Sequence, residues 1–309
     1  MRHSYLIGTE STPRIKRLRE MLVSTRPRVC YERAKLVTDV YRHTEDIQTI
    51  LRRAATLEKI LEGISVYILD GELIVGHLAS TLRGAPVFPE MDVEWLEKEL
   101  DTLETRAYDQ FIITEQCKEE LRALFSYWKG KTLRERLFAA LPEDTKRARL
   151  QSGVFSVTAH EESGLGHVLL NYERVLGSGL NGIRDEAEQK IKALDLSSPE
   201  DLRQLPFLRA VKTCCSAAIA WANRYSAEAD RLAKLESDPV RRRELEKIAD
   251  VCAWVPGNPA RGFHEALQSL WFVHLVPQLE TDGVAITPGR LDQYMYPFYR
   301  QDIDSGCVN

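Results

Sequence analysis

The sequence predicts a mainly α-helical protein with some β-structure, built as one domain rather than two. Apolar residues recur at helical spacing over most of the 309 residues, and capping residues or prolines stand where many of these runs begin. Strand-like patterns are confined to a few short stretches, and no repeat, low-complexity segment or flexible linker divides the chain. With 44% hydrophobic residues, the chain can bury one large core.

The first 150 residues are expected to form mostly helices. Thr12 followed by Pro13 predicts an N-cap and the first turn of a helix that ends by Arg26-Pro27. One β signal interrupts the helical pattern, because residues 66–68 and 73–75 flank the turn pair Asp70-Gly71 and together predict a tight hairpin. Residues 83–90 are interpreted as an ordered connecting loop. Amphipathic runs predict further helices over residues 31–41, 46–61, 91–104, 115–127, 132–141 and 143–150.

The pattern changes from residue 152 onward. Alternating apolar residues predict a strand over 154–159. The letters GSGLNG at 177–182 match a GxGxxG motif, but no βαβ unit surrounds them, so we interpret them as a flexible turn before a helix from about residue 182. A helix-start signal at 197–200 precedes a long helix predicted over 207–233, and Pro239 opens another that reaches about residue 253.

Residues 258–299 form the stretch around which we expect the rest of the chain to be arranged. It predicts a long buried helix from Phe263 that ends near Pro277, and then a short strand at 284–287 with a Pro-Gly exit. A second helix or turn begins at Leu291-Asp292. A buried helix that leads into such a strand is typical of barrel and sheet enzymes, which place functional residues at strand ends.

Composition excludes several classes of function. The net charge is −4 with both signs mixed, so no nucleic-acid partner is expected, and no apolar run is long enough to predict a membrane span or a secretory signal. The six cysteines form no CxxC pair, which favours reduced thiols in the cytoplasm. The adjacent Cys214 and Cys215 are expected in a helix, with one side chain facing the core. His264 and His274 stand ten residues apart without an HExxH motif, so no metal site is predicted.

Four segments resemble one known family, the glycyl radical enzymes that carry a pyruvate formate-lyase domain, and more closely its glycerol dehydratase-like branch. The resemblance covers nearly the whole chain in the right order. It implies that residues from about 12 to 150 form the helical N-terminal region, and that residues from about 151 to 309 form the first strands and helices of a ten-stranded α/β barrel. The segments read TPRIKRLREML with CYERAKLVTDVYR, DGELIVGHLASTLRGAPVFPE, SGLGHVLLNYERVLGSGLNGI, and GFHEALQSLWFVHL with ETDG and PGRLDQYMYPFY.

His167 is the first candidate for substrate binding. It lies between glycines and apolar residues, in a stretch expected to be a loop. On spacing alone, a lone histidine is more often structural than functional. In glycerol dehydratase-like enzymes, however, a histidine in this GxGH segment lines the substrate pocket and hydrogen-bonds a substrate hydroxyl. The resemblance therefore implies the same role for His167.

The segment ETDGVAITPGR resembles a second wall of the substrate pocket, which makes Asp282, Val284 and Ala285 further candidates. Diol dehydratases of the family carry a His-Ser pair just after the glycine, and the histidine assists hydroxyl departure. Val284 and Ala285 stand there instead, and neither side chain can transfer a proton. The resemblance thus implies a different leaving group or a bulkier substrate. Two interpretations of Asp282 stay open, a partner for a substrate amine and a turn-forming residue before glycine.

Arg290 and Asp292 are expected to be structural, with Asp292 as an N-cap and Arg290 paired beneath the barrel.

No catalytic residue is assigned. The family stores its radical on a glycine in an RVxGY-type segment and relays it through a cysteine in a GCVE-type segment. The sequence has no RVxGY, and Gly306-Cys307-Val308 follows Asp292 so soon that we interpret it as a chance match. We therefore expect the N-terminal part, under half, of a glycyl radical enzyme that does not turn over alone.

The resemblance also implies partners and chemistry. The whole enzyme would cleave a C–C, C–O or C–N bond of a small polar substrate under anaerobic conditions, as a homodimer. It would bind no separate cofactor, because a radical S-adenosylmethionine activase installs the glycyl radical. Two alternatives stay open, a subunit of a split glycyl radical enzyme and a non-catalytic helical binding or scaffold protein. A half-barrel is also expected to self-associate through open strand edges and exposed apolar surface.

Overall fold

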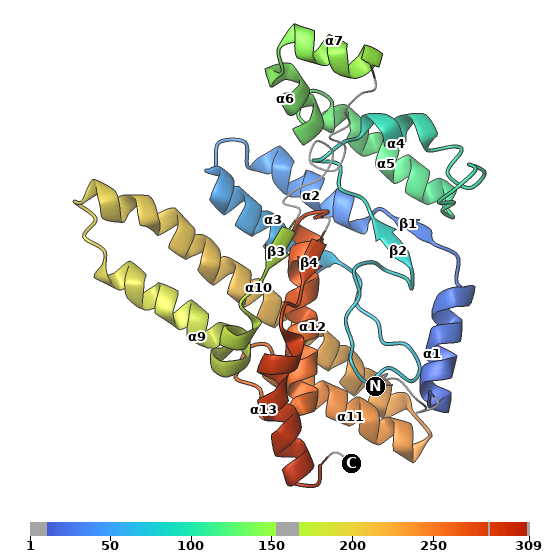
Figure 1. Ribbon diagram of the computed structural model, residues 1–309, viewed down its shortest axis with the longest axis vertical. Coiled ribbons are helices and arrows are strands. Elements are labelled where there is room, and N and C mark those ends of the chain that lie inside the picture. The colour runs from blue at the N-terminus through green and yellow to red at the C-terminus, as the bar shows by residue number, and fades with distance from the viewer. Residues whose placement is uncertain (1–10, 153–166, 284, 308–309) are drawn as a thin grey trace, which may run out of the picture.

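The structure is a computed structural model that describes residues 11–152, 167–283 and 285–307. Helices make up most of it, and four three-residue strands lie among them in the described residues (Figure 1). The first half contains α1 (Pro13–Ser24), β1 (Arg28–Cys30), α2 (Glu32–His43), α3 (Thr49–Gly63), β2 (Gly84–Pro86), α4 (Glu94–Glu99), α5 (Glu115–Trp128), α6 (Leu133–Ala140) and α7 (Glu143–Ser152). The second half contains β3 (His167–Leu169), α9 (Tyr172–Ala193), α10 (Pro199–Leu235), α11 (Pro239–Trp254), α12 (Phe263–Glu280), β4 (Ala285–Thr287) and α13 (Leu291–Asp304).

Capping side chains explain several helix starts. Thr12 and Thr114 each accept a hydrogen bond from the backbone N–H three residues later, and Ser198 does the same before Pro199. Thr132 and Glu135 form a reciprocal capping box at the start of α6. These four starts lie within a residue or two of capping signals that can be read from the sequence.

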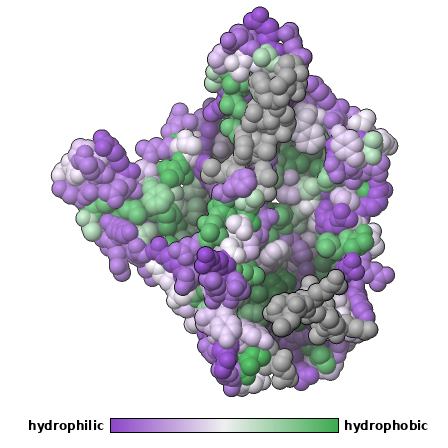
Figure 2. All heavy atoms as spheres, in the orientation of Figure 1, coloured by the Kyte–Doolittle hydropathy of each residue, from purple (hydrophilic) through white to green (hydrophobic). Residues whose placement is uncertain are grey.

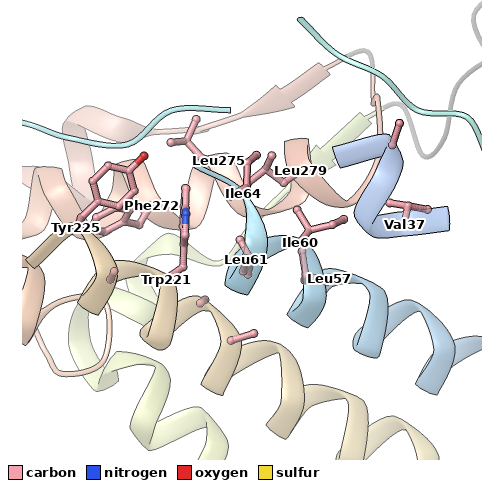
Figure 3. Close-up of a cluster of buried hydrophobic side chains, with 14 of the residues drawn as sticks. Val37, Leu57, Ile60, Leu61, Ile64, Trp221, Tyr225, Phe272, Leu275 and Leu279 are labelled. Atoms are coloured by element: carbon pink, nitrogen blue, oxygen red, sulfur yellow. The ribbon is translucent and has the colours of Figure 1, made fainter. Parts of the chain in front are cut away.

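The main core lies where α3, α10 and α12 meet (Figure 3). Ile60, Trp221 and Phe272 are fully buried there, and the rings of Trp221 and Phe272 pack edge to face with their centroids 5.4 Å apart. Burying one such side chain contributes about 1.5–3 kcal/mol. Cys214 and Cys215 lie in α10, and Cys215 is the buried one, as predicted.

The strands of the described residues form two separate two-stranded parallel sheets. β1 pairs with β2, and β3 pairs with β4 in the register His167 to Ala285, Val168 to Ile286 and Leu169 to Thr287. The mainly helical class with some strands is confirmed, whereas the described residues show no closed ten-stranded barrel. The strand predicted at 284–287 is present from Ala285, and the one predicted at 154–159 lies outside the described residues.

The hairpin predicted over residues 66–75 is wrong. The turn at Asp70-Gly71 exists, but no strand flanks it. The backbone groups of this segment find helix side chains instead: Gln268 bonds both the N–H and the C=O of Val75, at 2.8 and 2.7 Å, and the Tyr225 hydroxyl accepts from the N–H of His77 at 2.9 Å. Because side chains satisfy these groups, the segment needs no partner strand.

The prediction that residues 177–182 form a flexible turn before a helix is also wrong. They lie inside α9, which begins at Tyr172 and kinks at Gly179, where φ is +66°. A Cβ at Gly179 would lie 2.3 Å from the carbonyl oxygen of Gly257. The next two residues, Leu180 and Asn181, donate backbone hydrogen bonds to Pro256 and Gly257, so the kink serves a close contact with another loop.

Other predicted boundaries need correction. α4 covers only six residues of the helix predicted over 91–104. α10 begins at Pro199 rather than 207 and contains Pro206, and α12 passes Pro277 to reach Glu280. Packing against neighbouring helices outweighs the local cost of these prolines. Residues 84–86 of the predicted connecting loop form β2, and His167 lies in β3 rather than in a loop. No helix in the described residues is long and apolar enough to cross a membrane.

Candidate functional site

His167 and Ala285 stand opposite each other as the first register pair of β3 and β4. The structure therefore brings together two of the four candidate residues, although 118 positions separate them in the sequence. His167 and Leu169 are exposed, whereas Val168 between them is partly covered, as expected for side chains that alternate across a strand. Val284 lies outside the described residues.

A cavity of about 880 Å³ opens beside His167. Its lining includes the apolar residues Leu57, Ile60 and Trp128, together with charged groups from α3, from the segment after α5 and from the end of α12. Thr281 lines the same cavity, while Asp282 lines a smaller neighbouring pocket of about 300 Å³ with Phe88, Met91 and Trp95. Met91 contributes to both spaces. The structure thus places His167 and Asp282 in adjacent pockets rather than in one.

Arg33 fixes the end of α12, from which the candidate segment departs. Its guanidinium is fully buried and donates to the carbonyl oxygens of Leu279 and Glu280 at 2.7 and 3.0 Å. It also forms a two-pronged ion pair with Glu90, at 2.5 and 3.2 Å, and lies 3.7 Å from the centroid of the Phe88 ring. Arg33 therefore ties α2 and the loop at 87–90 to the exit of α12, which sets the position of Thr281 and Asp282.

An aromatic stack fixes the other ends of the two strands. Tyr172 follows β3 and its hydroxyl lies 2.9 Å from Nδ1 of His274 on α12. The Tyr172 ring stacks on Tyr294 of α13, whose hydroxyl donates to the carbonyl oxygen of Pro288 just after β4. Burial raises the pKa of Tyr172 to about 12 and lowers the pKa of His274. Both groups are therefore neutral near pH 7, and the neutral imidazole can accept the tyrosine hydrogen at Nδ1.

The charged groups around the large cavity are mostly paired. Glu45 accepts from Lys131 at 2.8 Å and Glu280 accepts from Arg53 at 2.6 Å. The hydrogen bond from Lys131, with its charge and that of Arg52, lowers the pKa of the Glu45 carboxyl. Glu90 is held by Arg33. Each of the three carboxylates that line the cavity among the described residues therefore has a cationic partner.

Sequence reasoning missed the residues that shape this cavity. Arg33, Arg52 and Thr281 carry no local motif, and their roles depend on contacts with elements far away in the chain. The N-cap of α13 is Arg290 rather than Asp292, and Asp292 lies in the first turn. Arg290 forms no ion pair with another described residue. Cys307 is exposed, as expected for a chance match, and the described residues contain no cluster of three or more potential metal ligands.

Comparison with known proteins decides the family. The sequence matches the model of the pyruvate formate lyase-like proteins over residues 9–309. The chain belongs to this family. The resemblance noted from the four sequence segments is thereby confirmed.

Individual relatives agree with the family match. The isethionate sulfite-lyase of Oleidesulfovibrio alaskensis is 38% identical over 309 residues, which cover 97% of this chain and 37% of that protein. A Roseburia inulinivorans structure that describes 1,2-propanediol dehydration superposes with a TM-score of 0.93 at 39% identity, over 97% of this chain and 36% of that chain. The glycerol-bound B12-independent glycerol dehydratase of Clostridium butyricum gives 0.92 at 40% identity, over 96% and 38%.

The chain thus spans little more than a third of the length of these relatives. This coverage agrees with the prediction that the sequence corresponds to under half of a glycyl radical enzyme.

Proposed function

We propose that the chain forms part of the reaction chamber of a glycyl radical lyase or dehydratase. One observation carries this proposal: His167 and Ala285, both candidates for substrate contact, are register partners on adjacent parallel strands in a chain that matches the family along its length. β3 and β4 would be the first strands of the ten-stranded barrel, and the open side of each would pair with strands from the rest of the enzyme.

The substrate would be a small polar molecule whose leaving group departs without a proton from position 284 or 285. Neither a valine nor an alanine side chain can protonate a departing hydroxyl. A leaving group that is stable as an anion needs no proton, and the similarity to an isethionate sulfite-lyase supports a reaction of this kind. His167 would hydrogen-bond a hydroxyl or other polar group of the substrate, and Asp282 would contribute from the adjacent pocket.

The radical chemistry would depend on residues that are not among these 309. A radical S-adenosylmethionine activase would install a glycyl radical, which supplies hydrogen abstraction through a cysteine. The enzyme would work as a homodimer in the cytoplasm, and six cysteines without a disulfide support that compartment.

Electron paramagnetic resonance tests the proposal. The chain would be incubated anaerobically with an activase and S-adenosylmethionine, alone and together with a polypeptide that carries the glycine and cysteine segments of the family. We expect a glycyl doublet only in the mixture. A doublet from the 309-residue chain alone would contradict the proposal, because the radical site would then lie within this sequence.

A split enzyme is the second candidate. Among the described residues β3 pairs only with β4, and Leu169 is 63% exposed, so both features fit a surface completed by another polypeptide. Co-purification of the tagged chain from its host, followed by mass spectrometry, tests this candidate. A partner with RVxGY-type and GCVE-type segments is expected, and recovery without one would contradict it.

A further inference from the structure

α1 lies at one edge of the molecule, across from α9 and α10 in the view of Figure 1. None of its residues is buried. Two arginines on one side of the helix hold it to the body: Arg14 forms an ion pair with Glu244 of α11, and Nη2 of Arg17 lies 3.3 Å from a carboxylate oxygen of Asp70. Most of the surface of α1 is therefore left uncovered by the other described residues.

The segment from α1 to the start of β1 is strongly basic, although the whole chain has a net charge of −4. Residues 13–28 contain one acidic side chain, Glu20, and six cationic ones, namely Arg14, Lys16, Arg17, Arg19, Arg26 and Arg28. Arg19, Arg26 and Arg28 are exposed, and none of the three forms an ion pair with a described carboxylate. Their uncompensated positive charges favour contact with an anionic partner.

A fourth arginine, from a distant part of the chain, joins this group. Arg83 has a φ of +54°, and its guanidinium donates to the carbonyl oxygen of Thr25 at 2.8 Å. The N–H of Arg28 in turn donates to the carbonyl oxygen of Arg83 at 3.1 Å. A positive φ is unfavourable for an arginine, so these contacts hold Arg83 in a conformation that it would not adopt by itself. The fold thus places two exposed arginines next to each other at the end of α1.

Apolar side chains lie beside these arginines. Ile15, Leu22 and Val23 of α1 are 51%, 48% and 69% exposed. Arg19 stands four residues after Ile15 and three before Leu22, so the three side chains share one face of the helix. A face that combines exposed apolar groups with arginines matches a segment that presents both apolar side chains and carboxylates.

We propose that the α1 surface, formed by Ile15, Arg19, Leu22, Arg26 and Arg83, binds an acidic amphipathic helix of another polypeptide. The carboxylates of that helix pair with the arginines, and its apolar side chains cover Ile15 and Leu22. A nucleic acid would pair with the arginines but leave the apolar side chains exposed. A membrane would need an uninterrupted apolar face, whereas Arg19 lies within this one. None of these five residues lines the cavity beside His167, so the proposal does not depend on the radical chemistry.

Fluorescence anisotropy of the 309-residue chain with a labelled synthetic peptide tests this proposal. The peptide has about 20 residues, with glutamate and leucine at helical spacing, and a second peptide of the same composition places its leucines on no single face. We expect the first peptide to bind at low salt and to bind more weakly as the salt concentration rises, because salt screens exposed charges.

Substitutions on the α1 surface should weaken this binding. Arg19→Glu and Arg26→Glu should each do so about fivefold, since an attractive contact becomes a repulsive one. Leu22→Gln should weaken it about threefold, because it removes an apolar contact. Arg209→Glu is the matched control and should leave the affinity unchanged. Arg209 is exposed on α10, forms no ion pair with a described carboxylate, and gives the same change of net charge.

Several outcomes would overturn the proposal, once circular dichroism has shown that every variant is folded. They are no binding of the first peptide, equal binding of the two peptides, equal losses in Arg19→Glu and Arg209→Glu, and unchanged binding in Leu22→Gln. Phosphatidylserine vesicles and a short DNA duplex serve as competitors. If either displaces the labelled peptide more effectively than the unlabelled peptide does, the α1 surface serves a membrane or a nucleic acid instead.

Discussion

Gly179 lies where α9 bends against the loop at 256–258, and the space at this point admits no side chain. Gly177, only two residues earlier in the same helix, has no atom within 4 Å of a Cβ built on it. The two glycines look alike in the sequence but differ in their surroundings and in backbone conformation, because only Gly179 has a positive φ. The pair therefore separates the combined effect of the close contact and the positive φ from the general helix preference of alanine.

We expect Gly179→Ala to destabilise the protein by at least about 2 kcal/mol, because the new methyl group meets a carbonyl oxygen and the φ of +66° is unfavourable for alanine. Gly177→Ala should instead be neutral or stabilising by up to about 1 kcal/mol. Urea unfolding followed by circular dichroism measures both. Equal effects of the two substitutions would show that neither the contact with Gly257 nor the positive φ of Gly179 determines the cost.

His274 makes stability depend on pH. Burial lowers its pKa below the ordinary value of 6.5, so the unfolded chain binds a proton more readily than the folded one. This histidine therefore destabilises the fold as pH drops below about 6.5, and it has no such effect above that value. His274→Gln keeps an acceptor for Tyr172 without titrating.

The urea midpoint at about pH 7.5 and about pH 5.5 measures this effect. We expect a smaller loss of stability on acidification for His274→Gln than for the wild type. His43→Gln, at an exposed position, is the control and should keep the wild-type pH dependence. A wild-type pH dependence in His274→Gln would contradict the assignment.

At the scale of elements, α12 holds the segment at 64–83 through polar side chains. Gln268 is fully buried and bonds both backbone groups of Val75, and Trp271 donates to the carbonyl oxygen of Gly76 at 3.1 Å. This explains why a helix that is apolar overall carries a buried glutamine. The Gln268 side chain bonds the backbone N–H and C=O of Val75, which a neighbouring strand would bond in a hairpin.

Gln268→Leu should therefore destabilise the protein by roughly 2–5 kcal/mol, since it leaves a buried N–H and a buried C=O unpaired. Hydrogen exchange at Val75 should accelerate strongly in the same variant. Gln278→Leu, on the same helix, removes only one bond, to the carbonyl oxygen of His274, and should cost less than about 1 kcal/mol. Unchanged exchange at Val75 in Gln268→Leu would contradict this role.

Local signals predict the elements much better than the contacts between them. The caps at Thr12, Thr114 and Thr132 and the strand after α12 follow from neighbouring residues, and so they can be read from the sequence. The bonds from Gln268 to Val75 and from Arg33 to Leu279 join residues 193 and 246 positions apart, and no spacing rule contains them. No local signal contains the pairing of His167 with Ala285, and the family resemblance implied only that both residues belong to the substrate pocket.

At the scale of the whole molecule, apolar side chains remain on the surface. Figure 2 shows apolar surface on this face near the arm that α9 and α10 form in Figure 1. Phe207 and Leu202 on α10 are 58% and 50% exposed, and Leu169 on β3 is 63% exposed. Exposed apolar side chains beside the two-stranded sheets are the features from which we expect the chain to self-associate.

Leu169→Lys should reduce self-association, because a charge beside the edge of β3 that no described strand covers opposes pairing with a second chain. Sedimentation velocity over a range of concentrations measures this effect. Leu235→Lys is the matched control, since Leu235 is 72% exposed at the end of α10 and lies on no strand. An equal change in the two variants would show that general solubility rather than the strand edge is responsible.

The tie between Arg33 and the end of α12 has a consequence for engineering. Residues 281–290 form a short segment that could be exchanged for the corresponding segment of a relative in a chimera. The residues just before this segment, however, are held by Arg33 of α2, which bonds the carbonyl oxygens of Leu279 and Glu280 and is paired with Glu90. A chimera that exchanges residues 281–290 must therefore also keep compatible residues at positions 33 and 90. Otherwise the end of α12 will shift, and the exchanged segment will be displaced with it.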